Sequence, residues 1–419
     1  MLSPRMRSDS VRETAPCRWP TEQSPAMQLS ITSDLEAVEH EWRCFEQRAE
    51  CTPFHTFDWL STWQRCIGRL AGVTPAIVTG RQSNGDVLFM LPLAIERARF
   101  SRRCVFLGHD LCDYNGPLLA PEFPRAFAPT DFANWWRAVE TFIQEKQEYR
   151  YDVILLDKMP ERIGRQANPL LALATTLNPH CAYRASLGKD WESYYGGKRS
   201  SATRSRERTK RRRLADNGEL RLVTASDPDD RKSALRTLFQ QKSRCLAQQD
   251  PTGLPRHGSS NLFTQPGQSN FYLSVAETAN SFIHVSRLDV GSRCVAANLG
   301  LQFREGYYHV LSSYDDGPLG RFGPGVIHLH ELMRYAISRG FRYFDFTIGD
   351  HPYKLDWADE TFKLYDHVAA AGWLGLPAAA KLVLTPRAKQ WLKTSPALWQ
   401  LARKVKFAVR SLSQNLSGE

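Results

Sequence analysis

The sequence predicts an α/β protein built from two tandem domains of one type, each with a mixed central sheet flanked by helices. At 419 residues, the chain exceeds the length at which a single hydrophobic core keeps growing, so two domains are expected. Its hydrophobic content of 42% is enough to form two such cores. The same order of strands, loop, helix and strand occurs in both halves, which favours tandem copies of one fold.

The first copy extends from residue 34 to residue 157. Apolar residues at helical spacing predict a helix over 34–49, with Ser33 as its N-cap, and a shorter helix over 59–67. The elements that follow are strands at 76–79, 86–95 and 104–108, a turn-rich stretch at 113–118, a helix over 131–146 and a strand at 151–156 that ends in Asp157.

The second copy repeats this order. Its elements are strands at 281–289, 295–303 and 307–314, a loop at 315–319, a helix over 326–339 and a strand at 341–347 that contains Asp345. The loops of the two copies share the tripeptide Gly-Pro-Leu, at 116–118 and 317–319. Their last strands share an acidic residue, so the repeat extends beyond the order of elements.

The composition restricts the partners and the compartment. A formal net charge of +11 and a pI of about 9.2 favour an anionic partner: nucleic acid, anionic lipid, a charged polysaccharide or a phosphate-bearing cofactor. Nine cysteines without a Cys-x-x-Cys pair argue against disulfides or a zinc site, and we expect no metal. The sequence has no apolar run of about 18 residues, and residues 1–26 lack the apolar centre of a signal peptide. We therefore expect a cytoplasmic protein, either free or attached to a membrane surface.

These patterns divide the chain into five parts. They are a disordered extension at 1–26 with Met27 as an alternative start, an N-terminal domain at 27–185, a basic helical linker at 186–220, a C-terminal domain at 221–375 and basic amphipathic helices at 376–419. The last part fits either a helix on anionic lipid or a helix that covers the core.

The most basic segment is Lys198–Arg213, in which nine of sixteen residues are Lys or Arg. Arg204, Arg208 and Arg212 are four residues apart, so they line one helical face that would bind phosphates or an acidic polymer. The alternative is a solvated linker helix. Because no aromatic residue interrupts the run, a nucleic-acid partner such as tRNA is the weaker interpretation.

A glycine-rich loop at 320–325 connects a predicted strand to a predicted helix. Backbone amides at such a helix entry approach a phosphate closely, and the helix dipole favours the anion. Arg321 would add a positive charge, while Gly323 and Gly325 allow the close approach. The alternative is a simple turn, and Pro324 removes one amide donor.

Proton-handling residues follow this helix. Strand alternation places Asp345 on the face of Tyr343 and Thr347, where a buried carboxylate needs a partner such as Lys354 or Arg342. Asp345 is therefore either a general base or a member of a structural ion pair. The loop Gly349–Trp357 adds His351, Tyr353 and Lys354, a density that favours function over a polar surface loop.

Several motifs resemble the BioF2-like acetyltransferase domain of the GNAT superfamily, which is found in CelD-like proteins of bacterial cellulose biosynthesis. In the second half they are Ser312–Asp315, Gly323-Pro-Gly325, Phe344-Asp-Phe346 and Gly349–Lys354. In the first half they are Thr52-Pro-Phe54, Trp59–Trp63, Leu91-Pro-Leu93 and Asp113–Pro117. The resemblance covers about residues 35 to 375.

The resemblance implies two tandem GNAT-like domains, as in the related Fem peptidyltransferases, and acetyl-CoA or another acyl-CoA as donor. Donor contacts are then expected at Tyr314 and in the loop 320–325, although Arg321 is one residue nearer to Gly323 than in the usual GNAT loop. Acceptor chemistry is expected over 345–354. There Asp345 or His351 would act as base, Tyr353 would protonate the leaving thiolate, and Lys354 would neutralise Asp345 or bind an acidic acceptor.

The resulting hypothesis is an acyl-CoA-dependent acyltransferase that acts on an amine or hydroxyl of a small molecule or polysaccharide-related acceptor. Two alternatives stay open. One is a Fem-like transferase that uses aminoacyl-tRNA, with the basic linker as the tRNA contact. The other is a non-catalytic GNAT-fold component of a polysaccharide-biosynthesis system.

Overall fold

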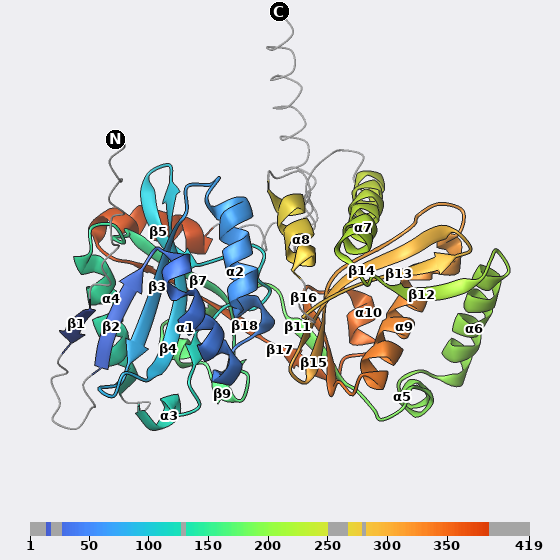
Figure 1. Ribbon diagram of the computed structural model, residues 1–419, viewed down its shortest axis with the longest axis horizontal. Helices are drawn as coiled ribbons and strands as arrows, with labels where there is room; N and C mark the ends of the chain where they lie inside the picture. The colour runs from blue at the N-terminus through green and yellow to red at the C-terminus, as the bar shows by residue number, and fades with distance from the viewer. Residues whose placement is uncertain (1–13, 18–26, 127–130, 250–266, 279–281, 385–419) are drawn as a thin grey trace, which may run out of the picture.

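The computed structural model describes residues 14–17, 27–126, 131–249, 267–278 and 282–384. Two large sheets lie side by side, each with helices packed on it (Figure 1). In this part of the chain, no helix combines the length and the apolarity needed to span a bilayer.

The first sheet has nine strands in the order β1-β2-β3-β4-β5-β7-β18-β10, with β6 beside β4. Its strands are β1 (Thr14–Cys17), β2 (Met27–Thr32), β3 (Thr74–Arg81), β4 (Val87–Ala98), β5 (Ser101–Phe106), β6 (Leu118–Leu119), β7 (Val153–Pro160), β10 (Thr175–Leu177) and β18 (Leu364–Ala370). The accompanying elements are α1 (Leu35–Arg48), α2 (Phe57–Trp63) with a π-helical turn at Gln64–Gly68, α3 (Phe123–Ala126), α4 (Phe132–Glu145) and the small pair β8 (Arg162–Ile163) and β9 (Gln166–Ala167).

The second sheet has seven strands in the order β12-β13-β14-β15-β16-β11-β17. They are β11 (Ala182–Ser186), β12 (Leu220–Thr224), β13 (Ile283–Val290), β14 (Arg293–Phe303), β15 (Gly306–Tyr314), β16 (Tyr343–Ile348) and β17 (Glu360–Phe362). Its helices are α5 (Trp191–Lys198), α6 (Ser201–Ala215), α7 (Pro228–Gln249), α8 (Gln268–Glu277), α9 (Pro324–Ser338) and α10 (Pro352–Leu355).

The prediction of two tandem copies is confirmed. In each copy a strand that follows a helix pairs in parallel with a strand of the antiparallel set before that helix. β7 follows α4 and pairs with β5 in the first copy, and β16 follows α9 and pairs with β15 in the second. Both parallel pairs are short, because each is registered over only three residue pairs.

One strand that follows the second sheet in the chain enters the first sheet. β18, near the end of the described chain, pairs with β7 of the first sheet, and β11 pairs with β16 of the second. β11 straddles the boundary predicted at residue 185. The first sheet is discontinuous in the chain because β18 joins it, whereas all strands of the second sheet lie within residues 182–362. The hydrophobic core is continuous between the halves, with Trp59 packed edge-on against Phe271 at a centroid distance of 4.9 Å.

Two local predictions were wrong. The N-cap of α1 is Asp34, not Ser33, because the Asp34 carboxylate accepts hydrogen bonds from the amides of Glu36 and Ala37. Residues 14–17 of the supposed disordered extension form β1, paired with β2; the rest of 1–26 lies outside the described residues. Of the predicted C-terminal helices, residues 376–384 are helical and residues 385–419 lie outside the described part.

Candidate functional site

The parallel strands β15 and β16 are paired at one end and unpaired at the other. Their register joins Gly306 to Tyr343 and ends with Tyr308 opposite Asp345. β15 then continues to Tyr314 and β16 to Ile348 without further pairing to each other, while their outer edges stay paired with β14 and β11. The backbone groups beyond the last pair need other partners, and polar side chains from several elements supply them.

Two lysines bond to carbonyl groups of these diverging strands. The Nζ of Lys354, which is 4% exposed, donates to the carbonyl oxygens of Thr347 at 3.3 Å and Ile348 at 2.8 Å. Burial lowers the pKa of Lys354 to about 8, against the opposing effect of nearby carboxylates. Lys242 of α7 lies 3.5 Å from the carbonyl oxygen of Ser312, and burial lowers its pKa as well.

A carboxylate from the first half completes this cluster. Asp113 lies in the loop after β5, and burial raises its pKa while Lys158, the side chain of Thr347 and Lys354 oppose the shift. Asp113 also interacts electrostatically with Lys242. The sequence predicted only a turn here. The structure instead brings Asp113 to the unpaired end of β16, more than two hundred residues further along the chain.

The loop that carries Asp113 is held by the first half. The Nζ of Lys158 on β7 donates to the carbonyl oxygens of His109 and Cys112, the latter at 2.6 Å. The side-chain amide of Asn115 donates to the carbonyl and the carboxylate of Asp157, both at 3.1 Å. These contacts on both sides of Asp113 restrict the positions that its carboxylate can take.

Asp345 is fully buried, and both of its oxygens are engaged. Oδ1 accepts from the Tyr114 hydroxyl at 2.6 Å and from the Thr347 amide at 2.8 Å, while Oδ2 accepts from Nη2 and Nε of Arg184 at 3.0 and 3.2 Å. The predicted ion-pair partners were wrong. Lys354 bonds to carbonyl groups, and Arg342 pairs with Glu305 at 3.1 Å.

Thr347 has a strained backbone in the middle of this cluster. Its φ of +57° lies in the left-handed region, which costs a β-branched residue free energy because Cβ crowds the backbone. The bond from the Thr347 amide to Asp345 holds this conformation. As a result, the Thr347 side chain faces Asp113, and the next carbonyl groups face Lys354.

The remaining predicted catalytic residues lie at the edge of the cluster. His351 is largely exposed, and partial burial together with Lys354 lowers its pKa. Burial raises the pKa of Tyr353 to about 12, and its ring packs edge-on against Phe346 at 6.1 Å between centroids. The structure thus brings His351 and Lys354 to the Asp113 cluster, whereas Tyr353 packs against the core.

The glycine-rich loop lies at the start of α9, which begins at Pro324. Gly323 is the N-cap, with a φ of +68° that favours glycine. The exposed ring of Tyr314 covers Gly325 so closely that an added Cβ would lie 3.2 Å from it. Lys210 of α6 also reaches this loop, since an added Cβ on Gly323 would lie 3.9 Å from its Nζ.

Helix α6 contains most of the basic run. Its inner face packs on α9 through the buried Leu214 and an ion pair between Arg211 and Glu331. Arg208 and Arg212 are exposed and Arg204 is partly buried. Among the described residues, none of these three arginines pairs with a carboxylate. Their charge is therefore available to a partner.

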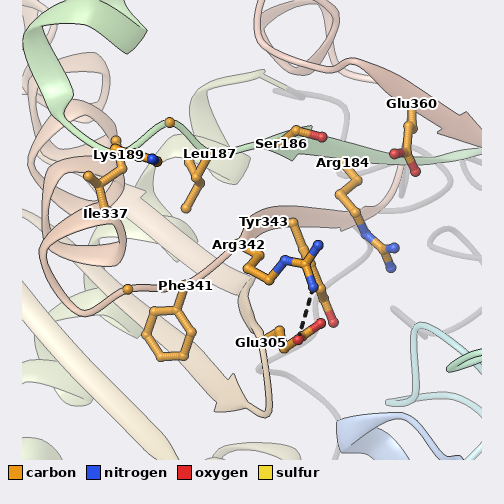
Figure 2. A pocket seen from close by; sticks show the side chains of 12 residues that line it. Arg184, Ser186, Leu187, Lys189, Glu305, Ile337, Phe341, Arg342, Tyr343 and Glu360 are labelled. Atoms are coloured by element: carbon orange, nitrogen blue, oxygen red, sulfur yellow. Dashed lines mark hydrogen bonds and ion pairs between the residues drawn. The ribbon is translucent and has the colours of Figure 1, made fainter.

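A pocket of about 660 Å³ lies at the other end of β16 (Figure 2). It is lined by Arg184, Ser186, Leu187, Gly188, Lys189, Glu305, Ile337, Gly340, Phe341, Arg342, Tyr343 and Glu360. The strand rise places Tyr343, at the pocket, about 17 Å from Ile348, at the lysine cluster. Arg184 belongs to both regions, because it lines the pocket and also holds Asp345.

Residues 201–355 match the family described as the acetyltransferase (GNAT) domain. The match covers less than half of the chain and assigns a GNAT domain to its second half. Among solved structures it is similar to that of FemX, with a TM-score of 0.54 and 10% identity over 82% of this chain and 98% of that chain. This likeness covers both halves, so the fold of the two halves together is similar to that of FemX. No protein of curated function matches the chain.

Two further similar structures are those of L-PGS from Bacillus licheniformis and of a tandem GNAT protein from the clavulanic acid biosynthesis pathway. The first has a TM-score of 0.47 and 14% identity over 87% of this chain and 98% of that chain. The second has a TM-score of 0.43 and 10% identity over 82% and 99%. The GNAT domain expected from the motifs of the second half is confirmed by the family match over residues 201–355.

The pKa of Lys354 predicts a pH dependence of stability. Its pKa is depressed in the folded protein, so between about pH 8 and pH 10.4 the unfolded chain binds more protons than the folded one. The free energy of unfolding should therefore rise with pH in this window, by on the order of 1–3 kcal/mol. Urea unfolding at pH 7.5 and 10 should show a smaller rise for Lys354→Met. The exposed Lys363→Met is the control, and equal rises in all three proteins would contradict the depressed pKa.

The unpaired arginines of α6 predict salt-dependent binding to polyanions. Replacing Arg204, Arg208 and Arg212 together by Gln should lower the salt concentration at which the protein elutes from heparin, because three positive charges that attract heparin are removed. Binding depends on salt because exposed charges are screened beyond about 10 Å at 0.1 M salt. Arg69→Gln, Arg125→Gln and Arg236→Gln, made together at exposed positions outside α6, form a control of equal charge. Unchanged elution of the α6 variant would show that this face is only a solvated helix surface.

Proposed function

We propose that the chain is an acyl-CoA-dependent acyltransferase that transfers the acyl group, most simply an acetyl group, to an amine or hydroxyl of a small-molecule or polysaccharide-related acceptor. The observation that carries this proposal is the cluster of Asp113, Lys242 and Lys354 around the unpaired ends of β15 and β16, inside a GNAT domain. Donor and acceptor held side by side there need only positioning and proton transfer.

The donor pyrophosphate is assigned to the start of α9. Positive charge from the helix dipole, Arg321 and Lys210 converges on a loop where Gly323 and Gly325 leave the backbone accessible. Tyr314 would pack against the donor beside Gly325. From this point the pantetheine arm would follow the edge of β15 that faces β16. Lys242 lies along this edge, because its ammonium group bonds to the carbonyl of Ser312.

Asp113 is the group best placed to accept the proton of the acceptor. Burial raises the pKa of Asp113 toward the pKa of the amine or hydroxyl that loses its proton in the transition state. A positioned base increases the rate about a hundredfold to ten-thousandfold. Lys354, with a pKa of about 8, would protonate the leaving thiolate. His351 at the edge is the alternative base, and Tyr353 the alternative acid.

Asp345 is proposed as a positioning residue. Its oxygens are occupied by Tyr114, Thr347 and Arg184, so no lone pair faces an acceptor. Because Tyr114 directly follows Asp113, the bond to Asp345 helps to fix the distance between the Asp113 carboxylate and β16. Loss of Asp345 would then disturb both stability and geometry.

A second candidate is an aminoacyl-tRNA-dependent transferase. Two observations favour it: the Fem-type fold over both halves, and the unpaired arginines of α6 next to the donor loop. In this case α6 would bind the tRNA backbone. In the non-catalytic alternative, the lysine cluster would bind neither an acyl donor nor an aminoacyl donor.

The donor assignment predicts that CoA raises the melting temperature of the wild-type protein and not that of Gly325→Glu. The glutamate would repel the pyrophosphate and crowd Tyr314. Gly372→Glu is the matched control, because Gly372 has an extended backbone and nothing within 4 Å of an added Cβ. If CoA gives no shift in the wild type while deacylated tRNA does, the second candidate replaces the first; if neither does, the chain is not a transferase of these types.

The proton-transfer assignment is tested with acetyl-CoA and a panel of primary amines and amino sugars, by release of free thiol. Asp113→Asn should lower turnover by about a hundredfold or more while the melting temperature stays within a few degrees. Asp345→Asn should lower the stability by about 3 kcal/mol, because it removes the partner of Arg184. His351→Ala and Tyr353→Phe should have smaller effects than Asp113→Asn. Full turnover of every variant per folded molecule would place the chemistry elsewhere.

A further inference from the structure

Large apolar side chains are exposed at one edge of the nine-stranded sheet. Phe100, at the tip of the β4–β5 hairpin, is 87% exposed, and Trp373, just after β18, is 78% exposed. Leu374, Leu376 and Leu384 are each more than half exposed. These five residues are called the apolar edge below. Single exposed apolar residues are ordinary, but a group of five is not.

Strand pairing places the two segments of the apolar edge next to each other. Arg103 of β5 pairs with Val153 of β7, which pairs with Ala370 of β18. One residue further out, the Asp152 amide donates to the carbonyl of Arg102, and the Asp152 carbonyl accepts from the amide of Ala371, both at 2.9 Å. The hairpin tip and the segment after β18 therefore leave the sheet at the same edge, as the cyan and red ribbons show (Figure 1).

The helix at 376–384 turns an apolar face away from the protein. Leu376, Ala380 and Leu384 are spaced four residues apart and are exposed, whereas Leu382 on the opposite side is partly buried. Lys381 is exposed on the outer side. The helix thus packs on the protein through one face, and its outer face carries both apolar side chains and a lysine.

Positive charge surrounds the apolar edge. Arg97 and Arg99 precede Phe100, and Arg150 precedes the start of β7; all three are exposed. The sequence after residue 384 contains seven Lys or Arg residues and one acidic residue, Glu419. Like charges disfavour both this tail and a second copy of the chain as the cover of the apolar edge, because each would bring cations against cations.

We propose that the apolar edge docks on the surface of an anionic lipid bilayer. Trp and Leu side chains partition into the interface between headgroups and acyl chains, and exposed cations next to them are attracted to anionic headgroups. Apolar insertion and electrostatic attraction are both needed here, since neither a few apolar residues nor a few cations alone gives stable membrane binding. This surface is separate from the transferase site, so it goes beyond the proposed function.

The test is sedimentation of the full chain with vesicles of phosphatidylcholine alone or with one third phosphatidylglycerol. Binding should require phosphatidylglycerol and weaken as salt rises. The double variant Trp373→Ala, Leu376→Glu should lower the partition coefficient by about tenfold, because it removes apolar area that the bilayer covers. Leu177→Glu is the matched control: Leu177 is as exposed as Leu376 but lies at the far end of β18, paired with Tyr365.

Three outcomes would overturn the proposal. The first is no binding to phosphatidylglycerol vesicles. The second is equal binding of the double variant and the wild type, which would assign any lipid contact to another part of the chain. The third is a wild-type dimer that the double variant converts to a monomer, which would identify a second copy as the occupant. Melting temperatures of the variants within a few degrees of the wild type confirm that folding is intact.

Discussion

The buried carboxylate of Asp345 is the interaction on which the arrangement of the two halves depends. It is fully buried, and its partners come from three places: Tyr114 in the first half, Arg184 on β11, and the backbone of β16 itself. A buried charge is tolerated only if its hydrogen-bonding capacity is satisfied. The position of β11 beside β16 and the position of the Asp113 loop against the second sheet are therefore coupled through one side chain.

The two copies of the fold differ at the place where their parallel strands diverge. In each copy a parallel strand pair is registered over three residue pairs, and a non-glycine residue with positive φ follows the last pair: Lys158 at +53° and Thr347 at +57°. In the first half the Lys158 ammonium bonds to the loop carbonyls and fills the place where the strands diverge. In the second half the equivalent place is bordered by lysines and by Asp113. The first half thus supplies a residue to the site of the second.

Burial and charge oppose each other throughout this site. Desolvation lowers the pKa of Lys242 and Lys354 and raises that of Asp113. All three shifts bring the proton affinities of acid and base closer together, which is what proton transfer near neutral pH requires. The strained Thr347 belongs to the same pattern, because an unfavourable backbone conformation persists only where several surrounding bonds hold it.

The sequence by itself determined most of the local structure. Hydrophobic periodicity located β3, β4, β13–β16, α1, α4 and α9, since alternation and helical spacing are properties of neighbouring residues. It also located the glycine-rich entry to α9 and the face of Asp345. His351 and Lys354 were predicted because they lie within a few residues of β16.

Only the tertiary structure decided the partners. The insertion of β18 into the first sheet and the pairing of Arg184 with Asp345 join residues with no periodic relation to each other. The same holds for Asp113, whose loop read only as a turn, and for Lys242, one of many polar residues on a helix. Local patterns report which residues become buried, but the identity of a buried residue's partner depends on how distant strands pair, and that is settled by the packing of the whole core.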